Sequence, residues 1–132
     1  MPADSRTRHH HERGSVTIQM VILMPALFAL MFLGLQAALY HHAREVAIAA
    51  AQEGARTAAG EHGSEAAGTT AATSFVADAG GDDVLADATV STSRSAATAV
   101  VIVTGRSLSV VPGWNPVVRQ RASMPVERVT SP

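Results

Sequence analysis

Two clusters of side chains in this sequence are of types that can bind a metal ion. Three histidines are adjacent at residues 9–11, and Asp82, Asp83 and Asp87 follow a pair of glycines. Three adjacent imidazoles on a polar tail are more typical of a solvated basic patch than of a zinc site. The aspartates lack the alternating ligands and the terminal Glu of an EF-hand. We therefore expect a bound metal at neither cluster.

The rest of the composition excludes several other functions. The chain has 132 residues and no cysteine, so it has no thiolate nucleophile and no disulfide. It contains no Ser/His/Asp arrangement, no phosphate-binding glycine loop and no HExxH motif. The formal net charge is -1, with one Trp and one Tyr, so no basic or aromatic surface for nucleic acid is expected. We predict no enzymatic activity, no cofactor, no small-molecule substrate and no nucleic-acid partner.

The dominant feature of the sequence is a long stretch without charge. No Asp, Glu, Lys or Arg lies between Arg13 and Arg44, and residues 20–35 are apolar or neutral throughout. As a helix, residues 16–40 would extend about 37 Å, which exceeds a hydrocarbon thickness of about 30 Å. A buried core helix is the alternative, but the stretch has no polar face and the remaining chain is too small to surround it. We predict a transmembrane helix over residues 15–40.

The arginines that flank this stretch predict its orientation. Of the arginines nearest to it, three precede the stretch, at positions 6, 8 and 13, and two follow it, at positions 44 and 56. An excess of basic residues before the span favours a cytoplasmic N-terminus. The expected protein is a single-pass component of the cell membrane, with residues 1–14 as a cytoplasmic leader and the C-terminal domain outside the cytoplasm.

Two alternatives remain open. A secretory signal peptide also joins a basic segment to an apolar stretch, but its apolar region runs about 7 to 15 residues and ends at an A-x-A-like site. Here the stretch is longer, and Leu35-Gln36-Ala37 places a large residue three positions before the cut. That alternative would be a secreted domain released by signal peptidase. The other is an unprocessed single-span accessory or sensor subunit.

Helical periodicity continues beyond the apolar stretch, through residues 41–60. Small residues recur at spacings of three and four, while charged residues occupy the other faces. A stripe of small side chains lets a sheet or another helix approach closely. An alanine-rich helix with high intrinsic propensity and no partner is the alternative. The predicted helix-packing residues are Ala43, Ala47, Ala50, Gly54 and Ala58.

The remaining residues, 61–132, predict a small extracytoplasmic α+β domain. Gly60, Gly63 and Gly68 interrupt the helical pattern, and alternating or β-branched residues follow further along the chain. The predicted fold class is α+β, with a long N-terminal transmembrane helix that extends out of the membrane, a short second helix and a small antiparallel sheet of about three strands. The expected elements are a helix at 69–79 and strands at 87–92, 99–104 and 117–126.

Three short motifs carry a resemblance to a known family. Glu12-Arg13-Gly14-Ser15 directly precedes the apolar stretch, and this resembles the class III signal of prepilins and of the TadE-like proteins of Tad pilus systems. Residues 51–59, Ala-Gln-Glu-Gly-Ala-Arg-Thr-Ala-Ala, resemble an alanine-rich R-E-G-A-R-A-A stretch on the long helix of TadE-like proteins. Residues 125–128, Pro-Val-Glu-Arg, resemble an ending found in actinobacterial members, and every basic residue of the chain is Arg.

The resemblance implies a function and a set of partners. A TadE/TadG-like, type IVb pilin-like protein would be a minor pilin or assembly component of a Tad (Flp-type) pilus, with a structural role in the biogenesis of an adhesion pilus. A prepilin peptidase would cut between Gly14 and Ser15 and leave the helix as anchor. The implied partners are that peptidase, the pilus platform membrane proteins and other pilin-like subunits. The order of elements also resembles that of type IV pilins.

The sequence departs from the pilin pattern at one position. Pilin-like subunits typically have Glu at the fifth mature position, which here is Gln19. In the family that carboxylate is thought to pair with the α-amino group of a neighbouring subunit, since an uncompensated charge in lipid costs several kcal/mol or more. Gln19 accepts a hydrogen bond but cannot neutralise an amine, which favours a minor, capping or assembly role. The alternative is that Gln19 is a tolerated polar residue near the membrane edge.

Overall fold

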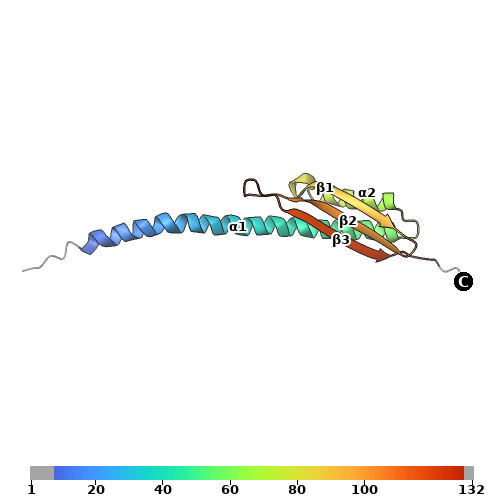
Figure 1. Ribbon diagram of the computed structural model, residues 1–132, viewed down its shortest axis with the longest axis horizontal. Coiled ribbons are helices and arrows are strands. Elements are labelled where there is room, and N and C mark those ends of the chain that lie inside the picture. Colours follow the sequence, from blue (N-terminus) through green and yellow to red (C-terminus); the bar gives the residue numbers. More distant parts are fainter. Residues whose placement is uncertain (1–7, 130–132) are drawn as a thin grey trace, which may run out of the picture. The chain divides into compact units, whose positions relative to one another are not determined.

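The computed structural model describes residues 8–129, and it describes side chains from residue 13 onward. Residues 1–7, the first half of the predicted cytoplasmic leader, lie outside this range. The predicted α+β class, with a long N-terminal helix, a short second helix and a three-stranded antiparallel sheet, is confirmed (Figure 1). The elements are α1 (Arg8–Ala59), α2 (Glu65–Asp78), the 3-10 turn η1 (Gly81–Asp83), β1 (Leu85–Arg94), β2 (Thr98–Ser107) and β3 (Val117–Pro125).

The chain divides into two compact units, and the boundary falls within α1. The first unit ends at Leu35, and its described part is the N-terminal portion of α1. The second unit begins at Gln36 and holds the rest of α1 together with α2 and the sheet. Each unit is described by itself below.

The first unit exposes its apolar side chains on all sides. Between Val16 and Leu35 the large apolar side chains are 45–68% exposed. Of the helices that the structure describes, α1 is long and apolar enough to cross a membrane. None of its most apolar stretch of 18 residues is buried inside the chain. Such a surface is stable only in contact with lipid or with other apolar surfaces. This part of α1 is therefore not the core helix of the chain.

The second unit is built around an antiparallel sheet with β2 in the centre. The strand order is β1-β2-β3, and Val103 of β2 lies opposite Val90 on one side and Gln120 on the other. Alternate residues of β2 are buried from Ala99 to Ser107, as the period of two in a strand requires. One face of the sheet therefore forms the core, and the other carries polar and partly exposed side chains.

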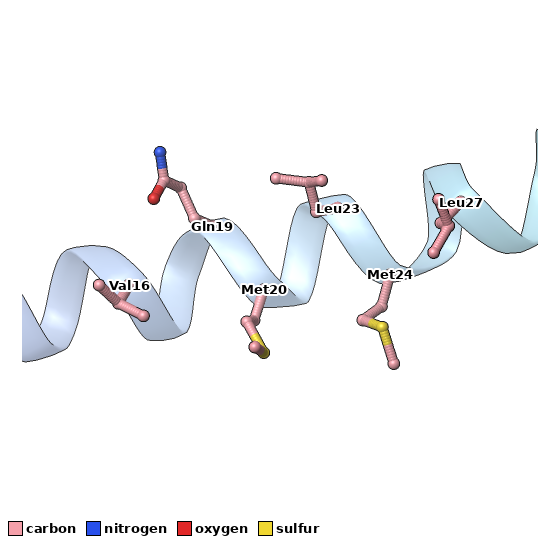
Figure 2. A pocket seen from close by; sticks show the side chains of 6 residues that line it. All are labelled: Val16, Gln19, Met20, Leu23, Met24 and Leu27. Atoms are coloured by element: carbon pink, nitrogen blue, oxygen red, sulfur yellow. The ribbon is translucent and has the colours of Figure 1, made fainter.

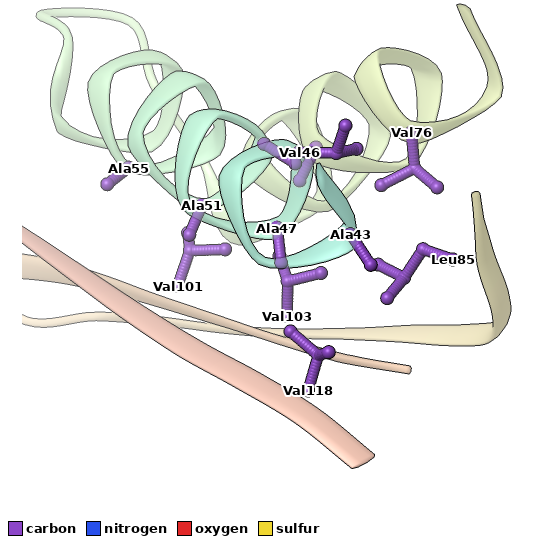
Figure 3. Packing of buried hydrophobic residues seen from close by; sticks show 12 residues of the cluster. Ala43, Val46, Ala47, Ala51, Ala55, Val76, Leu85, Val101, Val103 and Val118 are labelled. Carbon is purple, nitrogen blue, oxygen red and sulfur yellow. The ribbon is translucent and has the colours of Figure 1, made fainter. Parts of the chain in front are cut away.

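Helix α1 packs on the inner face of this sheet through small side chains. Ala43, Ala47 and Ala51 are at most 1% exposed, and Val101 and Val103 of the sheet are fully buried. Figure 3 shows Ala47 and Ala51 directed from α1 toward these two valines. Since each alanine buries little apolar area, the close approach of helix and sheet has to supply the packing density.

Glycines allow α1 and α2 to approach each other even more closely. A Cβ atom at Gly54 would lie 2.9 Å from Ala72 Cβ and 2.9 Å from the carbonyl oxygen of Gly68. A Cβ atom at Gly68 would lie 2.8 Å from Ala58 Cβ. Real Cβ atoms do not approach other atoms so closely, so both positions require glycine if the two backbones are to keep this distance.

The role of Gly68 corrects the sequence-based expectation for the second helix. We predicted Gly68 as a helix breaker and a start at residue 69, but α2 begins at Glu65 and includes Gly68. The hydroxyl of Ser64 caps the helix by accepting a hydrogen bond from the Ala67 N–H at 3.0 Å. The cap and the contact with α1 offset the roughly 1 kcal/mol that a glycine costs inside a helix.

Substitution of Gly54 by alanine tests this close contact. The added methyl group meets the backbone of α2, so Gly54→Ala should lower the free energy of unfolding by about 1–3 kcal/mol, the usual effect of overpacking. Circular dichroism during thermal unfolding of the detergent-solubilised chain measures the change. Gly60→Ala is the matched control, because a Cβ atom there meets nothing closer than 3.5 Å. Equal stability of the two variants would contradict the packing described here.

Candidate functional site

Gly14 and Ser15, the candidate cleavage residues, lie within α1 and are exposed. A Cβ atom at Gly14 would meet nothing within 4 Å. The hydroxyl of Thr17 donates a hydrogen bond to the Arg13 carbonyl at 2.9 Å, so the helix continues across this point. A peptidase that binds an extended chain would have to unwind it locally. Glycine inside a helix is less favourable than alanine by about 1 kcal/mol, so Gly14 makes this unwinding easier.

A shallow apolar groove runs along α1 in the first unit, just after Gly14 and Ser15. Its lining residues are spaced by three and four and so lie on one face of α1, and Gln19 is the polar side chain among them. Figure 2 shows Gln19 and Leu23 along one edge of this face and Met20 and Met24 along its other edge. Such rows of side chains accept the ridge of a neighbouring helix. The lining residues are Val16, Gln19, Met20, Leu23, Met24 and Leu27.

The small-residue stripe of α1 lies in the second unit and is buried there. The structure places the four alanines of the stripe within two clusters of the core and its glycine against α2. The stripe is thus occupied by the same chain, and the alternative of an alanine-rich helix without a partner is wrong. The buried residues are Ala43, Ala47, Ala50, Gly54 and Ala58.

Gln36 is a site residue that the sequence analysis did not identify. It is the first residue of the second unit and only 3% exposed. Its Oε1 accepts a hydrogen bond from the Val110 N–H at 2.9 Å and lies 3.0 Å from the Ser109 hydroxyl. Its Nε2 donates to the Leu108 carbonyl at 3.3 Å. The side-chain amide of Gln36 therefore holds the segment between β2 and β3 against α1.

A signal for Gln36 was present in the sequence. Between Gln19 and His41 it is the one residue with a side-chain amide or a charge, in a stretch that is otherwise apolar. A buried amide without a partner is unfavourable by several kcal/mol in an apolar environment, so such a residue needs hydrogen-bonding groups close by. The sequence does not say which segment supplies them, because Leu108 is 72 residues away.

The two clusters considered for metal binding provide no ligand set among the described side chains. Asp82 Oδ1 accepts a hydrogen bond from the Asp87 N–H at 3.3 Å, and Asp87 has the left-handed φ of 52° where β1 is irregular. From residue 13 to residue 129, no group of three or more His, Asp or Glu side chains is arranged to hold a metal ion. The histidines at residues 9–11 lie outside the side chains that the structure describes.

Comparison with known families gives one match. The family model described as TadE-like protein matches residues 14–56. No curated protein and no solved structure matches the chain significantly. The matched region begins at Gly14, takes in the apolar part of α1 and Gln36, and ends three residues before α1 does. The resemblance to TadE-like proteins is confirmed over these residues, and α2 and the sheet lie outside them.

Proposed function

Since residues 14–56 are TadE-like, we propose that the chain is a minor pilin-like or assembly component of a Tad (Flp-type) pilus or a related secretion system. Its role is structural, in the biogenesis of an adhesion pilus. The observation that carries the proposal is the exposed apolar half of α1, directly preceded by Gly14-Ser15 where the family match begins. The proposed partners are a prepilin peptidase, the pilus platform membrane proteins and other pilin-like subunits.

The proposal takes residues 16–35 as the membrane-spanning part of α1. As a helix this segment extends about 30 Å, which equals the thickness of a typical hydrocarbon core. Gln36 follows directly and belongs to the folded second unit. This span is six residues shorter than the predicted one over residues 15–40, by one residue at its start and five at its end. The excess of arginine before the span supports a cytoplasmic N-terminus and an extracytoplasmic second unit.

The groove beside Gln19 supports a role in contact with other pilin-like helices. In lipid, apolar surfaces give no hydrophobic driving force, so association depends on close packing and on hydrogen bonds between helices. The Gln19 amide can both donate and accept such a bond, which contributes about 0.6–2 kcal/mol in membranes. It carries no charge to neutralise an α-amino group. This supports a minor or assembly role rather than that of a major filament subunit.

Release as a secreted domain is less compatible with the fold. A signal peptidase cut after Ala37 would remove Gln36 from the second unit. The Val110 N–H and the Leu108 carbonyl would then lose their partners in this structure. Both bonds are part-buried, and a typical intramolecular hydrogen bond contributes about 0.5–1.5 kcal/mol to stability. The unprocessed single-span subunit keeps these bonds, and it differs from the proposal in retaining residues 1–14.

Substitution at Gly14 tests the proposed processing. Valine adds a branched side chain where glycine lets the backbone approach the peptidase closely, so Gly14→Val should abolish cleavage. Immunoblots of membranes from cells with an active prepilin peptidase would show only the longer form. Gly34→Val is the matched control, since neither glycine has a neighbour within 4 Å of its Cβ position. Normal cleavage of Gly14→Val would count against this processing site.

A carboxylate at position 19 tests the argument about charge. Gln19→Glu supplies the group that could pair with an α-amino group, so it should increase the amount of this subunit in sheared pilus fractions. Thr17→Glu places the same charge on another face of the helix, also at an exposed position, and should not increase it. Quantitative mass spectrometry of the fractions measures both. If Gln19→Glu leaves incorporation unchanged, charge pairing at this position does not limit the role of the subunit.

A further inference from the structure

The segment between β2 and β3, residues 108–116, is called here the β2–β3 loop, and it exposes large apolar side chains. Leu108 is 39% exposed, Val111 38% and Trp114 50%. Surface loops are normally polar, and apolar area left in water is unfavourable by roughly 25 cal/mol per Å². Trp114 is the only tryptophan of the chain. An exposed group of this kind indicates an apolar or amphipathic partner.

Hydrogen bonds fix the position of this loop along α1. The Gln36 amide binds the loop through Leu108, Ser109 and Val110, as described above. The loop also closes on itself, because the Ser107 N–H donates to the Pro116 carbonyl at 3.0 Å. Gln36 is covalently joined to Leu35, the last residue of the proposed span. The loop is therefore hydrogen-bonded to the residue that directly follows the proposed span.

The side chains around the loop have the composition of a membrane interface. Trp and Tyr are enriched at the level of the lipid headgroups, and Tyr40, which is 38% exposed, lies one helical turn beyond Gln36. Arg106 and Val117 are paired where β2 and β3 meet the loop, and both are exposed. Arg119 is exposed two residues further along β3. Guanidinium groups bind phosphate oxygens through paired hydrogen bonds.

We propose that the β2–β3 loop is a second membrane contact, in which Leu108, Val111 and Trp114 insert among the lipid headgroups on the extracytoplasmic side. Arg106 and Arg119 bind the lipid phosphates beside it. The Gln36 amide is compatible with this environment because its oxygen and nitrogen are both hydrogen-bonded to the loop. The second unit is then fixed against the membrane by a helix and a loop. This inference rests on the proposed anchor at residues 16–35.

The fluorescence of Trp114 tests the proposal directly. The full chain is reconstituted into vesicles of phosphatidylcholine and phosphatidylglycerol, and its emission is compared in vesicles with and without brominated lipid and after addition of iodide. Because the chain has one tryptophan, the signal reports this loop alone. We expect brominated lipid to remove most of the emission and iodide to remove little. Strong quenching by iodide, or quenching by neither reagent, would overturn the proposal.

Two further variants separate the loop from the rest of the chain. Trp114→Phe combined with His62→Trp moves the reporter to an exposed turn after α1, about 35 Å of helix beyond Gln36, and should reverse the two quenching results. Gln36→Ala removes the hydrogen bonds to the loop and should increase quenching of Trp114 by iodide. Gln52→Ala, at an exposed position of the same helix, is its control and should not. An unchanged result for Gln36→Ala would contradict the proposed tether.

Flotation of the same vesicles distinguishes failure of the loop proposal from failure of the anchor. If the chain floats with the vesicles but Trp114 is accessible to iodide, the loop proposal is wrong and the anchor stands. If the chain does not float, the proposed anchor is wrong, and the loop proposal fails with it. Flotation together with quenching by brominated lipid supports both.

Discussion

The close approach of α1 to the central strand and to α2 is the contact on which the folded unit depends. The chain is rich in alanine and valine and poor in aromatic residues, so no single side chain contributes much buried area. The core is densely packed because Ala47 and Ala51 let α1 lie close to the valines of β2. Gly54 and Gly68 likewise let α1 and α2 come into contact. A larger residue at these glycines forces the elements apart.

The same helix meets two different environments. From Met20 to Leu35 its large side chains are apolar and exposed on every face, whereas from Gln36 onward one face is buried under a sheet. A helix that is apolar on all faces is typical of a membrane span, and a stripe of small residues is typical of close packing against protein. Gln36 is the first residue of the folded unit, and its side chain is hydrogen-bonded to the loop between β2 and β3. The boundary between the anchor and the folded unit thus falls within one helix.

Features set by local periodicity could be predicted from the sequence. The helix ends at Ala59, close to the predicted residue 60, and the three strands lie where alternating or β-branched residues occur. The start of α2 was missed because the Ser64 cap and the contact of Gly68 with α1 outweigh the intrinsic cost of glycine. Gln36 was missed because its partners are more than 70 residues away, and no local pattern records such a contact. The candidate processing site at Gly14 and Ser15, by contrast, is a prediction that rests on four adjacent residues, 12–15.

The central claim is that this chain enters the membrane as a precursor and functions as a processed, TadE-like subunit. The intact mass of the unmodified protein, extracted from the membranes of cells that contain an active prepilin peptidase, tests this claim most directly. The account predicts a mass that corresponds to a chain beginning at Ser15. Retention of residues 1–14 would contradict it and would favour an unprocessed single-span subunit, and a fragment beginning near Ala38 in the soluble fraction would indicate release by signal peptidase.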